Sequence, residues 1–450
     1  MNVIAVFDIG KTNKKILLFN ESFELLEQNE EKFPTITDDE GFECDDIERI
    51  ENWIIASLKA LIGQPNYHLK AVNFSTYGAT LVFLDAKGQR LTPLYNYLKP
   101  VSDEIQNRLF DQYGGQQEFC RKTASPALGL LLNTGIQMLW LKYQQAEVFG
   151  KVATILNFPQ YLSYLLTKKV VAEPTYLGCH TFLWDFDQNG YHEWVSKEGF
   201  QLDVPVDSDT AYEVELAGHK FMAGVGIHDS SASLAPYLLG VQEKFVLVST
   251  GTWCVSMNPF NEDPLTDDEL ANNCLKYLSI YQKPVKSTMY FMGHIHDVNV
   301  ERIQGHFNVD SKAYHKVALD RALTDRIFEK EKVFFKNGTP EGHVDEQVDL
   351  SQFESFEMAY HQFMYDLTLE CAHYLKITLP KNDDGKSLIV TGGFARNSLY
   401  IENLVRLFPT KQVFTSEMDN ASALGAAMVC VAKSQGQIKP AINLGLKLWS

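Results

Sequence analysis

The sequence predicts an α/β protein with two lobes, and three observations support this fold class. The chain has 450 residues, which at about 150 residues per domain suggests two or three domains. Val3–Phe7 and Ile16–Phe19 are apolar, β-rich runs on either side of a polar turn. Phe245–Ser249 and Trp253–Met257 repeat this pattern of strand, turn and strand in the second half of the chain. The repetition indicates two similar halves with a cleft between them.

The remaining elements of the first half alternate between strands and helices. Further strands are predicted at Phe23–Glu27, Val72–Ser75 and Leu81–Leu84. Ile47–Leu61 has apolar residues at helical spacing, and helical patterns dominate from residue 101 to residue 166. Within that stretch, we predict that Ala127–Leu141 is a core helix, because it is too short and too polar to span a bilayer.

The second half contains a long helix, a strand and a final helix. Phe353–Leu379 is amphipathic and ends before a proline, which cannot continue a helix. Leu388–Thr391 is predicted to be a buried strand that runs into Gly392 and Gly393, and Ala421–Lys433 is the last predicted helix. In the Gly293–His296 segment two histidines alternate, and we expect a loop there rather than a metal site.

Composition narrows the classes of partner and compartment. The net charge is −17, which argues against nucleic acid or an anionic membrane as a partner. The seven cysteines are scattered and form no C-x-x-C pair, so neither a disulfide framework nor a zinc site is expected. Asp8 and Lys11 interrupt the first apolar run, unlike the core of a signal peptide. We therefore expect a soluble, cytoplasmic protein.

The segment from Asp8 to Asn13 is the first candidate for phosphate binding. It places a carboxylate at the end of a strand, followed by Gly10 and a polar turn. Successive N–H groups in such a turn can face phosphate oxygens, and the carboxylate can hold a hydrated Mg²⁺. The spacing is not that of a Walker A loop. The alternative interpretation is an ordinary hairpin with solvent-facing lysines.

Two later turns could also bind parts of a nucleotide. Thr250–Thr252 separates two predicted strands and is either a second phosphate turn or a β-turn beside a packed Trp253. Gly392 and Gly393 follow a strand, and glycines let a flat base or a ribose approach the backbone closely. A simple tight turn is the alternative at this second position.

Asp229 is the candidate general base. The Ala223–Ser231 segment has two glycines, then His228 and Asp229, then two serines that lead into an apolar run. This pattern suits the start of a helix, where Asp229 could instead serve as the N-cap. Phosphoryl transfer to an alcohol needs a carboxylate within hydrogen-bond reach of the attacking hydroxyl.

The order of these motifs resembles that of the FGGY carbohydrate kinases, over essentially the whole chain. Gln160–Thr167 is similar to the family's D-Y-L-x-x-x-L-T-G helix, and Ala421–Ala427 is similar to its final helix of small residues. The resemblance implies the two-lobed actin-like ATPase fold, which is ribonuclease H-like, with nucleotide and sugar in the cleft between the lobes. Residues 1–240 would form a lobe with the sugar site and the first phosphate motif, and residues 241–450 would form the ATP-binding lobe.

The resemblance also implies a role for each matching residue. Asp229 would be the general base, and Asp8 would hold Mg²⁺ through water. The residues implied in binding phosphate and ATP are Gly10, Lys11, Thr12, Asn13, Lys15, Gly251, Thr252, Gly392, Gly393, Ala395 and Asn397. The residues implied in binding the sugar are Ser75, Tyr77, Gly78, Tyr97, His228 and Asp229.

The chain departs from the family pattern at three places. Lys15 stands where the family often has arginine, so the charge is kept but the bidentate fork is lost. Gln160 stands where aspartate is common. Leu94–Lys99 takes the place of a sugar-binding W-x-D-x-R segment and lacks its aspartate.

The activity that the resemblance implies is ATP-dependent phosphorylation of a sugar hydroxyl. The motifs Thr12-Asn13, His228-Asp229 and Gly251–Trp253 look most like those of the L-fuculose and L-rhamnulose kinases. A 6-deoxy ketohexose is therefore the first expectation, and its methyl group would suit an aromatic pocket. Another ketose or a polyol, such as xylulose or ribulose, is the alternative substrate.

Two other classes of protein are compatible with the same fold. One is an ATP or polyphosphate hydrolase, and the other is a catalytically inactive, sugar-responsive regulator. Retention of both Asp8 and Asp229 argues against the regulator. A homodimer is possible, since dimers are common in the family.

Overall fold

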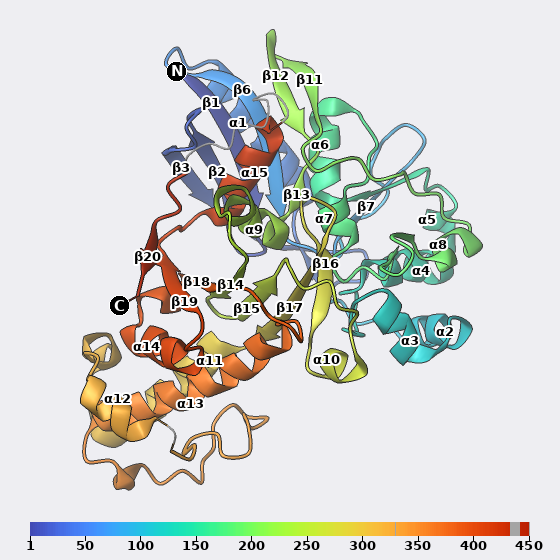
Figure 1. Ribbon diagram of the computed structural model, residues 1–450. Coiled ribbons are helices and arrows are strands. Elements are labelled where there is room, and N and C mark those ends of the chain that lie inside the picture. Colours follow the sequence, from blue (N-terminus) through green and yellow to red (C-terminus); the bar gives the residue numbers. More distant parts are fainter. Residues whose placement is uncertain (329, 433–441, 450) are drawn as a thin grey trace.

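Two mixed β-sheets form the frame of the protein (Figure 1). The computed structural model describes residues 1–328, 330–432 and 442–449. The first sheet has the strand order β11-β12-β6-β1-β2-β3, with β13 also paired to β6. Its strands are β1 (Asn2–Ile9), β2 (Lys14–Phe19), β3 (Leu25–Glu31), β6 (His68–Thr76), β11 (Ala211–Leu216), β12 (His219–Gly224) and β13 (Ile227–His228). β1 pairs with β2 in antiparallel fashion and with β6 in parallel, and β6 in turn pairs in parallel with β12 and β13.

The second sheet has the order β16-β17-β15-β14-β18-β19-β20. Its strands are β14 (Phe245–Thr250), β15 (Cys254–Asn258), β16 (Leu275–Leu278), β17 (Pro284–Tyr290), β18 (Ser387–Gly392), β19 (Gln412–Ser416) and β20 (Leu446–Leu448). As in the first sheet, the central antiparallel hairpin (β14 with β15) adjoins a parallel pair (β14 with β18). The repeated strand–turn–strand pattern in the sequence therefore does mark two similar sheets.

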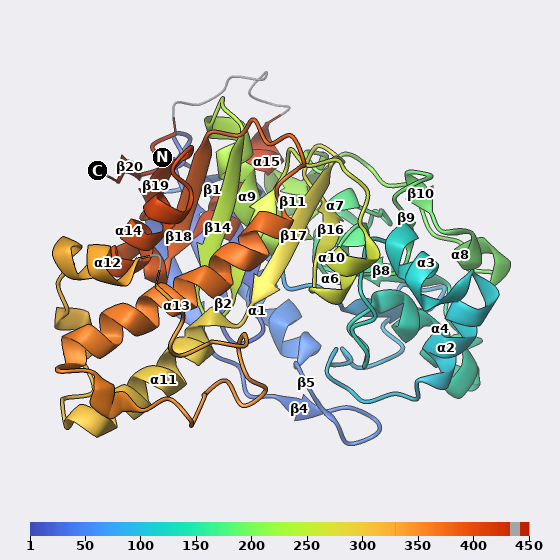
Figure 2. The ribbon, with the colours of Figure 1, turned by 60° about the horizontal axis from the view of Figure 1, so that its bottom comes forward.

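Helices cover both faces of each sheet. α1 (Ile47–Ile62) and α6 (Phe158–Thr167) pack on one face of the first sheet, and α15 (Ala421–Val431) packs on the other. α9 (Asp229–Gly240) lies against α15 and against the second sheet, so these two helices separate the sheets (Figure 1). The outer face of the second sheet is covered by α11 (Met292–Phe307), α13 (Phe356–Ile377) and α14 (Ser398–Leu407) (Figure 2).

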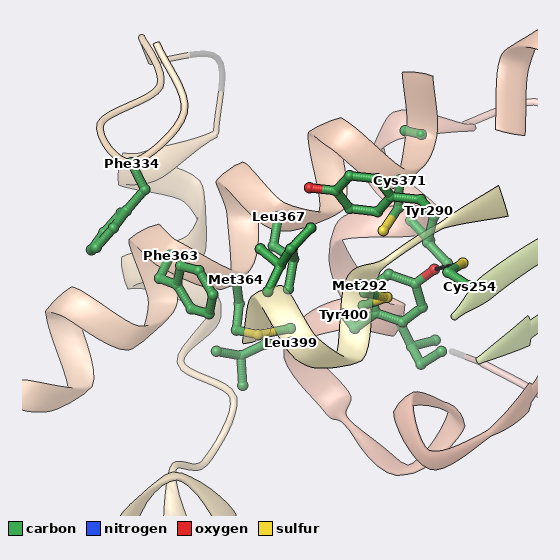
Figure 3. Close-up of a cluster of buried hydrophobic side chains, with 14 of the residues drawn as sticks. Cys254, Tyr290, Met292, Phe334, Phe363, Met364, Leu367, Cys371, Leu399 and Tyr400 are labelled. Carbon is green, nitrogen blue, oxygen red and sulfur yellow. Dashed lines mark hydrogen bonds between the residues drawn. The ribbon is translucent and has the colours of Figure 1, made fainter. Parts of the chain in front are cut away.

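The outer layer of the second sheet contains a large buried cluster (Figure 3). Phe363, Met364 and Leu367 on α13 meet Leu399 and Tyr400 on α14, and all five side chains are almost completely buried. Burial of apolar area on this scale fixes α13 and α14 against the sheet. The turn after β18, between these helices and the sheet edge, is thereby held in place.

A smaller, mainly helical region is inserted between β6 and β11 of the first sheet. Its elements are β7 (Leu81–Leu84), α2 (Glu104–Gln112), α3 (Gly115–Lys122), α4 (Thr134–Gln144), α5 (Ala146–Phe149), β8 (Thr154–Asn157), α7 (Pro174–Leu177), β9 (Trp184–Asp185), β10 (Gly190–Tyr191) and α8 (Glu193–Lys197). The other short elements are β4 (Ile36–Thr37), β5 (Glu43–Cys44), α10 (Asp267–Ala271), η1 (Ala313–Lys316), α12 (Arg321–Ile327), η2 (Leu350–Gln352) and η3 (Gly393–Arg396). A third buried cluster, around Trp140 and Trp194, holds the inserted region together.

Most predicted elements are confirmed, with three corrections. The core helix predicted at Ala127–Leu141 begins only at Thr134, because the Asn133 side chain accepts a hydrogen bond from the Leu128 N–H and holds the preceding loop in a non-helical conformation. His294 and His296 lie on α11, not in a loop. The helical stretch up to residue 166 is interrupted by β8, which pairs with β7. Lys433, the predicted end of the last helix, lies outside the described residues.

The division of the chain at residues 240 and 241 stays a prediction, and one element complicates it. α15 belongs to the second half of the sequence, yet it packs on the first sheet through Ala423, Ala426 and Ala427. In the part of the chain that the structure describes, no helix has both the length and the apolar character needed to cross a bilayer.

The close approach of α9 and α15 leads to a stability prediction. A Cβ atom at Gly425 would lie 1.9 Å from the carbonyl oxygen of Ala232, which belongs to the backbone of α9. We expect Gly425→Ala to lower the free energy of unfolding by about 2 kcal/mol or more, because the two helices must separate. Urea denaturation followed by circular dichroism measures the change.

Gly305 in α11 provides the matched control. A Cβ atom there would meet no atom within 4 Å. Gly305→Ala should leave stability unchanged or raise it by up to about 1 kcal/mol, because alanine favours the helix. Equal denaturation midpoints for Gly425→Ala and Gly305→Ala would contradict the close packing of α9 against α15.

Candidate active site

Three neighbouring parallel strands of the first sheet end at the same edge. Asp8 on β1 lies opposite Ser75 on β6, and His228 on β13 lies opposite Thr76. Parallel strands that end together place the residues after them side by side, which is where open α/β sheets usually bind ligands. Asp8, Ser75 and the His228-Asp229 pair are therefore brought together from three distant parts of the sequence.

Asp229 begins α9 at this edge. His228 occupies the N-cap position, so Asp229 is the first helical residue and the N-cap alternative does not apply to it. Ser230 Oγ donates a hydrogen bond to Asp229 Oδ1 at 3.2 Å. Loss of hydration raises the pKa of Asp229 from its ordinary value to about 6, against the opposing effect of the Ser230 hydrogen bonds. A carboxylate of this kind can accept a proton near neutral pH.

Asp8 is the second carboxylate at this edge. Ser422 Oγ on α15 donates to Asp8 Oδ2 at 2.9 Å. Burial raises the pKa of Asp8 to about 6, and the charge of Asp229 adds to this shift. The nearby charge of Lys15 lowers the pKa of Asp8 and opposes these effects more weakly. Two oxygen ligands of this sort are the donors that Mg²⁺ prefers.

Two histidines lie beside Asp229. His228 Nε2 is 3.3 Å from Asp229 Oδ1, and the ring of His180 lies 6.5 Å from that of His228, centroid to centroid. Burial lowers the pKa of each histidine to about 4, and for His180 the neighbouring His228 contributes. Both rings are thus neutral at physiological pH. Gly78 leaves room for them, since a Cβ atom there would lie 2.9 Å from His228 Nε2.

A charged cluster forms a further wall near this edge. The carboxylate of Asp45 accepts hydrogen bonds from Lys11 and Lys14, each at 2.8 Å, and from the Tyr77 hydroxyl at 2.7 Å. Lys11 Nζ also lies 5.3 Å and 5.5 Å from the ring centroids of Tyr77 and Tyr97. Burial alone would raise the pKa of Asp45, but the two lysines outweigh it and hold that pKa below its ordinary value.

This cluster changes the interpretation of the first turn. The side chain of Lys11 turns toward the predicted sugar residues Tyr77 and Tyr97, so only its backbone N–H remains for the predicted phosphate role. Lys14 is 1% exposed, which rules out the hairpin with solvent-facing lysines at that position. The turn itself is tight, with the Gly10 N–H donating to the Asn13 carbonyl at 2.9 Å.

The turns that follow β14 and β18 in the second sheet also lie at one edge of that sheet. Thr250 at the end of β14 lies opposite Gly392 at the end of β18. Thr250 Oγ1 accepts a hydrogen bond from the Phe394 N–H at 3.0 Å, which ties the two turns together. Gly392 has a φ of 82°, and a Cβ atom there would overlap the Thr250 carbonyl oxygen at 1.8 Å. Only glycine fits this close approach.

A cavity of about 350 Å³ opens beside the Gly392-Gly393 turn. Its lining includes Gly393, Phe394 and Asn397, together with aromatic residues from other elements: His296, Tyr314 and Tyr360. The Tyr360 hydroxyl accepts from Asn397 Nδ2 at 3.0 Å and contacts His296 Nε2 at 3.1 Å. Asn397 also caps α14 by accepting from the Leu399 and Tyr400 N–H groups. Aromatic rings therefore form much of the cavity wall, and hydrogen bonds hold Tyr360 and Asn397 in place.

Side chains in the first turn of α15 and just before it connect the strand edges of the two sheets. Arg396 in the glycine turn pairs with Asp419 at 3.1 Å, and Ser422 three residues later bonds Asp8. The turn at Gly251 and Thr252 is held by α11, because the Gly293 N–H at the start of that helix donates to the Thr252 carbonyl at 3.0 Å. Trp253 is not packed as the β-turn alternative required, since it is 48% exposed and stacks on Phe291.

The predicted residues thus form two groups. The first group lies at the edge of the first sheet and comprises Asp8, Gly10, Lys11, Thr12, Asn13, Lys15, Ser75, Tyr77, Gly78, Tyr97, His228 and Asp229. The second lies at the edge of the second sheet and comprises Gly251, Thr252, Gly392, Gly393, Ala395 and Asn397. Sequence reasoning missed Asp45, His180 and the aromatic cavity wall, because no local motif marks them.

The fold and this arrangement define a class of protein with a two-lobed, actin-like α/β fold and with glycine-containing turns at the strand ends of both sheets. Residues 3–197 match the N-terminal domain of the FGGY family of carbohydrate kinases, and residues 242–440 match its C-terminal domain. The chain belongs to this family.

Solved structures agree with the assigned fold. A carbohydrate kinase from Novosphingobium aromaticivorans superposes with a TM-score of 0.80 at 21% identity, covering 99% of this chain and 93% of that one. The xylulose kinase from Rhodospirillum rubrum also gives a TM-score of 0.80, at 13% identity, covering 100% of this chain and 93% of that one.

The curated sequence relatives match a smaller share of the chain than the solved structures do. The rhamnulokinase of Oceanobacillus iheyensis is 24% identical over 266 residues, which is 55% of this chain and 54% of that protein. A rhamnulokinase of Yersinia pestis is 27% identical over 242 residues, or 51% of this chain and 47% of that protein. The chain spans about half the length of the curated relatives that it matches.

Proposed function

We propose that the protein transfers the γ-phosphoryl group of ATP to a hydroxyl group of a sugar, with Asp229 as general base. The observation that carries this proposal is the position of Asp229. Its carboxylate lies at the edge where β1, β6 and β13 end, beside Asp8, Gly78 and His228. The raised pKa of Asp229, about 6, suits a group that takes a proton from an alcohol near neutral pH.

The residues around Asp229 would orient the sugar. Gly78 leaves open the space that His228 Nε2 borders. Burial raises the pKa of Tyr97, and the nearby charges of Asp229 and Asp45 raise it further. A hydroxyl bound here would lie between Asp229 and the Lys11–Tyr97 wall. Hydrogen bonds from Lys11 to sugar oxygens would hold the acceptor in place, since Lys11 has donors left after pairing with Asp45.

The turn donors would hold the phosphates. The backbone N–H groups of Lys11, Thr12 and Asn13 follow Asp8 directly, and Gly251 and Thr252 form the corresponding turn of the second sheet. Donors of this kind stabilise charge on a transferring phosphoryl group. The carboxylates of Asp8 and Asp229 fit Mg²⁺, with Asp8 holding it through water. When bound, Mg²⁺ would neutralise negative charge on the phosphate oxygens.

The aromatic cavity beside Gly393 would take the adenosine. Its volume, about 350 Å³, is in the range of small-ligand pockets, and it adjoins the glycine turn. The rings of Tyr314, Phe394 and Tyr360 offer faces or edges for a flat base. Asn397 would act mainly through its contacts with Tyr360 and α14.

Among acceptors, we propose a 6-deoxy ketohexose first, with L-rhamnulose ahead of L-fuculose. Proteins named rhamnulokinases are among the relatives, and the ring of Tyr97 offers an apolar surface for a methyl group. Xylulose or ribulose is the alternative, because Lys11 also makes this wall polar.

The experiment is an assay of ADP formation with MgATP over a panel of ketoses. The panel pairs L-rhamnulose with L-fructose, its 6-hydroxy counterpart, and adds L-fuculose, D-xylulose, L-ribulose, D-ribulose and glycerol. We expect one ketose to stimulate ADP formation strongly and L-rhamnulose to exceed L-fructose in kcat/KM. A preference for L-fructose or a pentulose would overturn the 6-deoxy assignment, and no stimulation by any acceptor would count against the kinase.

The pH dependence follows from the raised pKa of Asp229. The base must be ionised, so kcat/KM for the sugar should be constant above about pH 6 and fall about tenfold per pH unit below it. The fall could be steeper, because the pKa of Asp8 is also about 6. An aspartate at its ordinary pKa of 3.8 would instead keep activity to much lower pH. A profile that stays flat well below pH 6 in the stable range of the fold would contradict the assignment.

A further inference from the structure

Three metal-ligating side chains converge beside the proposed base. The thiol of Cys179 and one ring nitrogen each of His180 and His228 all lie within 4.8 Å of one another. Cys179 and His180 follow α7, whereas His228 ends β13, so the fold and not a sequence motif brings them together. This is why the spacing of the cysteines gave no sign of a zinc site.

The imidazole of His180 is oriented as that of a metal ligand usually is. His180 Nδ1 contacts the Leu132 carbonyl at 3.0 Å. A carbonyl only accepts hydrogen bonds, so Nδ1 carries the hydrogen and Nε2 presents its lone pair. Donation of the second ring N–H to a backbone carbonyl is the usual arrangement for a histidine that binds a metal.

The space between the rings is also left open. A Cβ atom at Gly78 would lie 2.9 Å from His228 Nε2 and 3.5 Å from His180 Nε2, so both nitrogens border the same small volume. His228 Nδ1 is buried without a hydrogen-bond partner among the described residues. His228 Nε2 lies 3.3 Å from Asp229 Oδ1, and a bound metal ion would replace this contact.

The ligand types select one class of metal. A thiolate and two imidazoles suit Zn²⁺, whereas Mg²⁺ prefers oxygen ligands. Ligand atoms in a tetrahedral zinc site lie about 3.3–3.8 Å apart, so separations of up to 4.8 Å must shorten by as much as about 1 Å on binding. Asp229 Oδ1, 3.3 Å from His228 Nε2, or a water molecule could take the fourth position. Binding would release the Cys179 thiol proton to solvent as the Zn–S bond forms.

We propose that Cys179, His180 and His228 form a binding site for Zn²⁺ that excludes the sugar and so inhibits the enzyme reversibly. Zinc at this position would hold His228 and lie against Asp229, which removes both from the acceptor. The inhibition rests on the proposed function, but the binding of the metal does not.

Binding is tested with Co²⁺ as a spectroscopic substitute for Zn²⁺. We expect one Co²⁺ per chain, with the near-ultraviolet absorption of a cobalt–thiolate bond and the strong visible bands of tetrahedral Co²⁺, and displacement by Zn²⁺. Cys179→Ser should abolish the thiolate band, whereas Cys120→Ser, at another buried cysteine, should keep it. Absence of the band in the wild-type protein, or its persistence in Cys179→Ser, would overturn the site.

Inhibition is tested with the best acceptor of the ketose panel. Zn²⁺ should raise KM for the sugar, with MgATP in excess, and a chelator should restore activity. Cys179→Ser should keep most of the activity measured without zinc and need at least about tenfold more Zn²⁺ for half inhibition. Equal inhibition of both proteins would overturn the switch. If His180→Gln also lowers Co²⁺ affinity, the site is supported even where serine perturbs folding.

The two proposals can fail separately. A cobalt–thiolate band in a protein that no ketose stimulates would uphold the metal site and count against the sugar kinase. Sugar-dependent ADP formation without any band would do the reverse.

Discussion

Asp229→Asn is expected to lower kcat for sugar phosphorylation by about a thousandfold, because general base catalysis contributes 10²–10⁴-fold. Asparagine has nearly the same shape, so the contact with His228 and the bond from Ser230 can remain. The amide cannot take the proton of the attacking hydroxyl. Steady-state kinetics and a separate nucleotide-binding titration measure the effect, and we expect ATP binding to be retained.

Stability distinguishes this loss from simple unfolding. The pKa of Asp229 is raised in the folded protein, so its ionised form destabilises the fold at any pH above that pKa. Removing the charge should therefore leave the denaturation midpoint unchanged or higher. Asp267→Asn, in the first turn of α10, is the matched control and should keep full activity. Retained turnover in Asp229→Asn would exclude Asp229 as the base.

Asp45→Asn is expected to lower the free energy of unfolding by about 3 kcal/mol, because it leaves buried positive charge without a counter-ion. Lys14 is 1% exposed and shares the Asp45 carboxylate with Lys11. Among the described residues, Asp45 is the only carboxylate that forms an ion pair with Lys11 or Lys14, and the substitution removes its charge. Urea denaturation measures the change, and KM for the sugar should also rise, since Tyr77 and Lys11 lose their shared anchor.

An exposed ion pair gives the comparison. Glu213 and Lys220 lie 3.1 Å apart on the first sheet and are both about two-thirds exposed. Glu213→Gln should leave the denaturation midpoint unchanged, because such pairs contribute little. A similarly small effect of Asp45→Asn would mean that the cluster of Asp45, Lys11 and Lys14 is hydrated in solution and does not stabilise this side of the site.

Local patterns were enough to predict the ends of the central strands. Asp8, Thr250 and the Gly392-Gly393 pair each follow a β-rich run, and parallel pairing then places them at common edges. Asp229 was predicted from a different local pattern, the glycines, histidine and serines that suit the start of a helix, and the structure places it at the first residue of α9. Such positions can be predicted because one segment of sequence contains both the strand and the residue that follows it.

The missed features depend on contacts between distant segments. Asp45 contacts Lys11 and Lys14, which lie more than thirty residues earlier in the sequence. His180 and His228 are separated by an even longer stretch of sequence. The sequence predicted a final helix of small residues from Ala421, but nothing local shows that it packs on the first sheet. Asn133 shortened a predicted helix because its side chain bonds the backbone of the loop before it, which competes with helix formation.

The fate of the γ-phosphate tests phosphoryl transfer to a sugar most directly. The protein would be incubated with ATP labelled at that phosphate and the ketose that most stimulates ADP formation, and the products separated. We predict that the label appears in a sugar monophosphate, in equal amount to the ADP formed, and that Asp229→Asn produces none. Label released as inorganic phosphate whether or not sugar is present would instead identify a hydrolase. Bound nucleotide with no turnover would contradict the kinase and favour a sugar-responsive regulator.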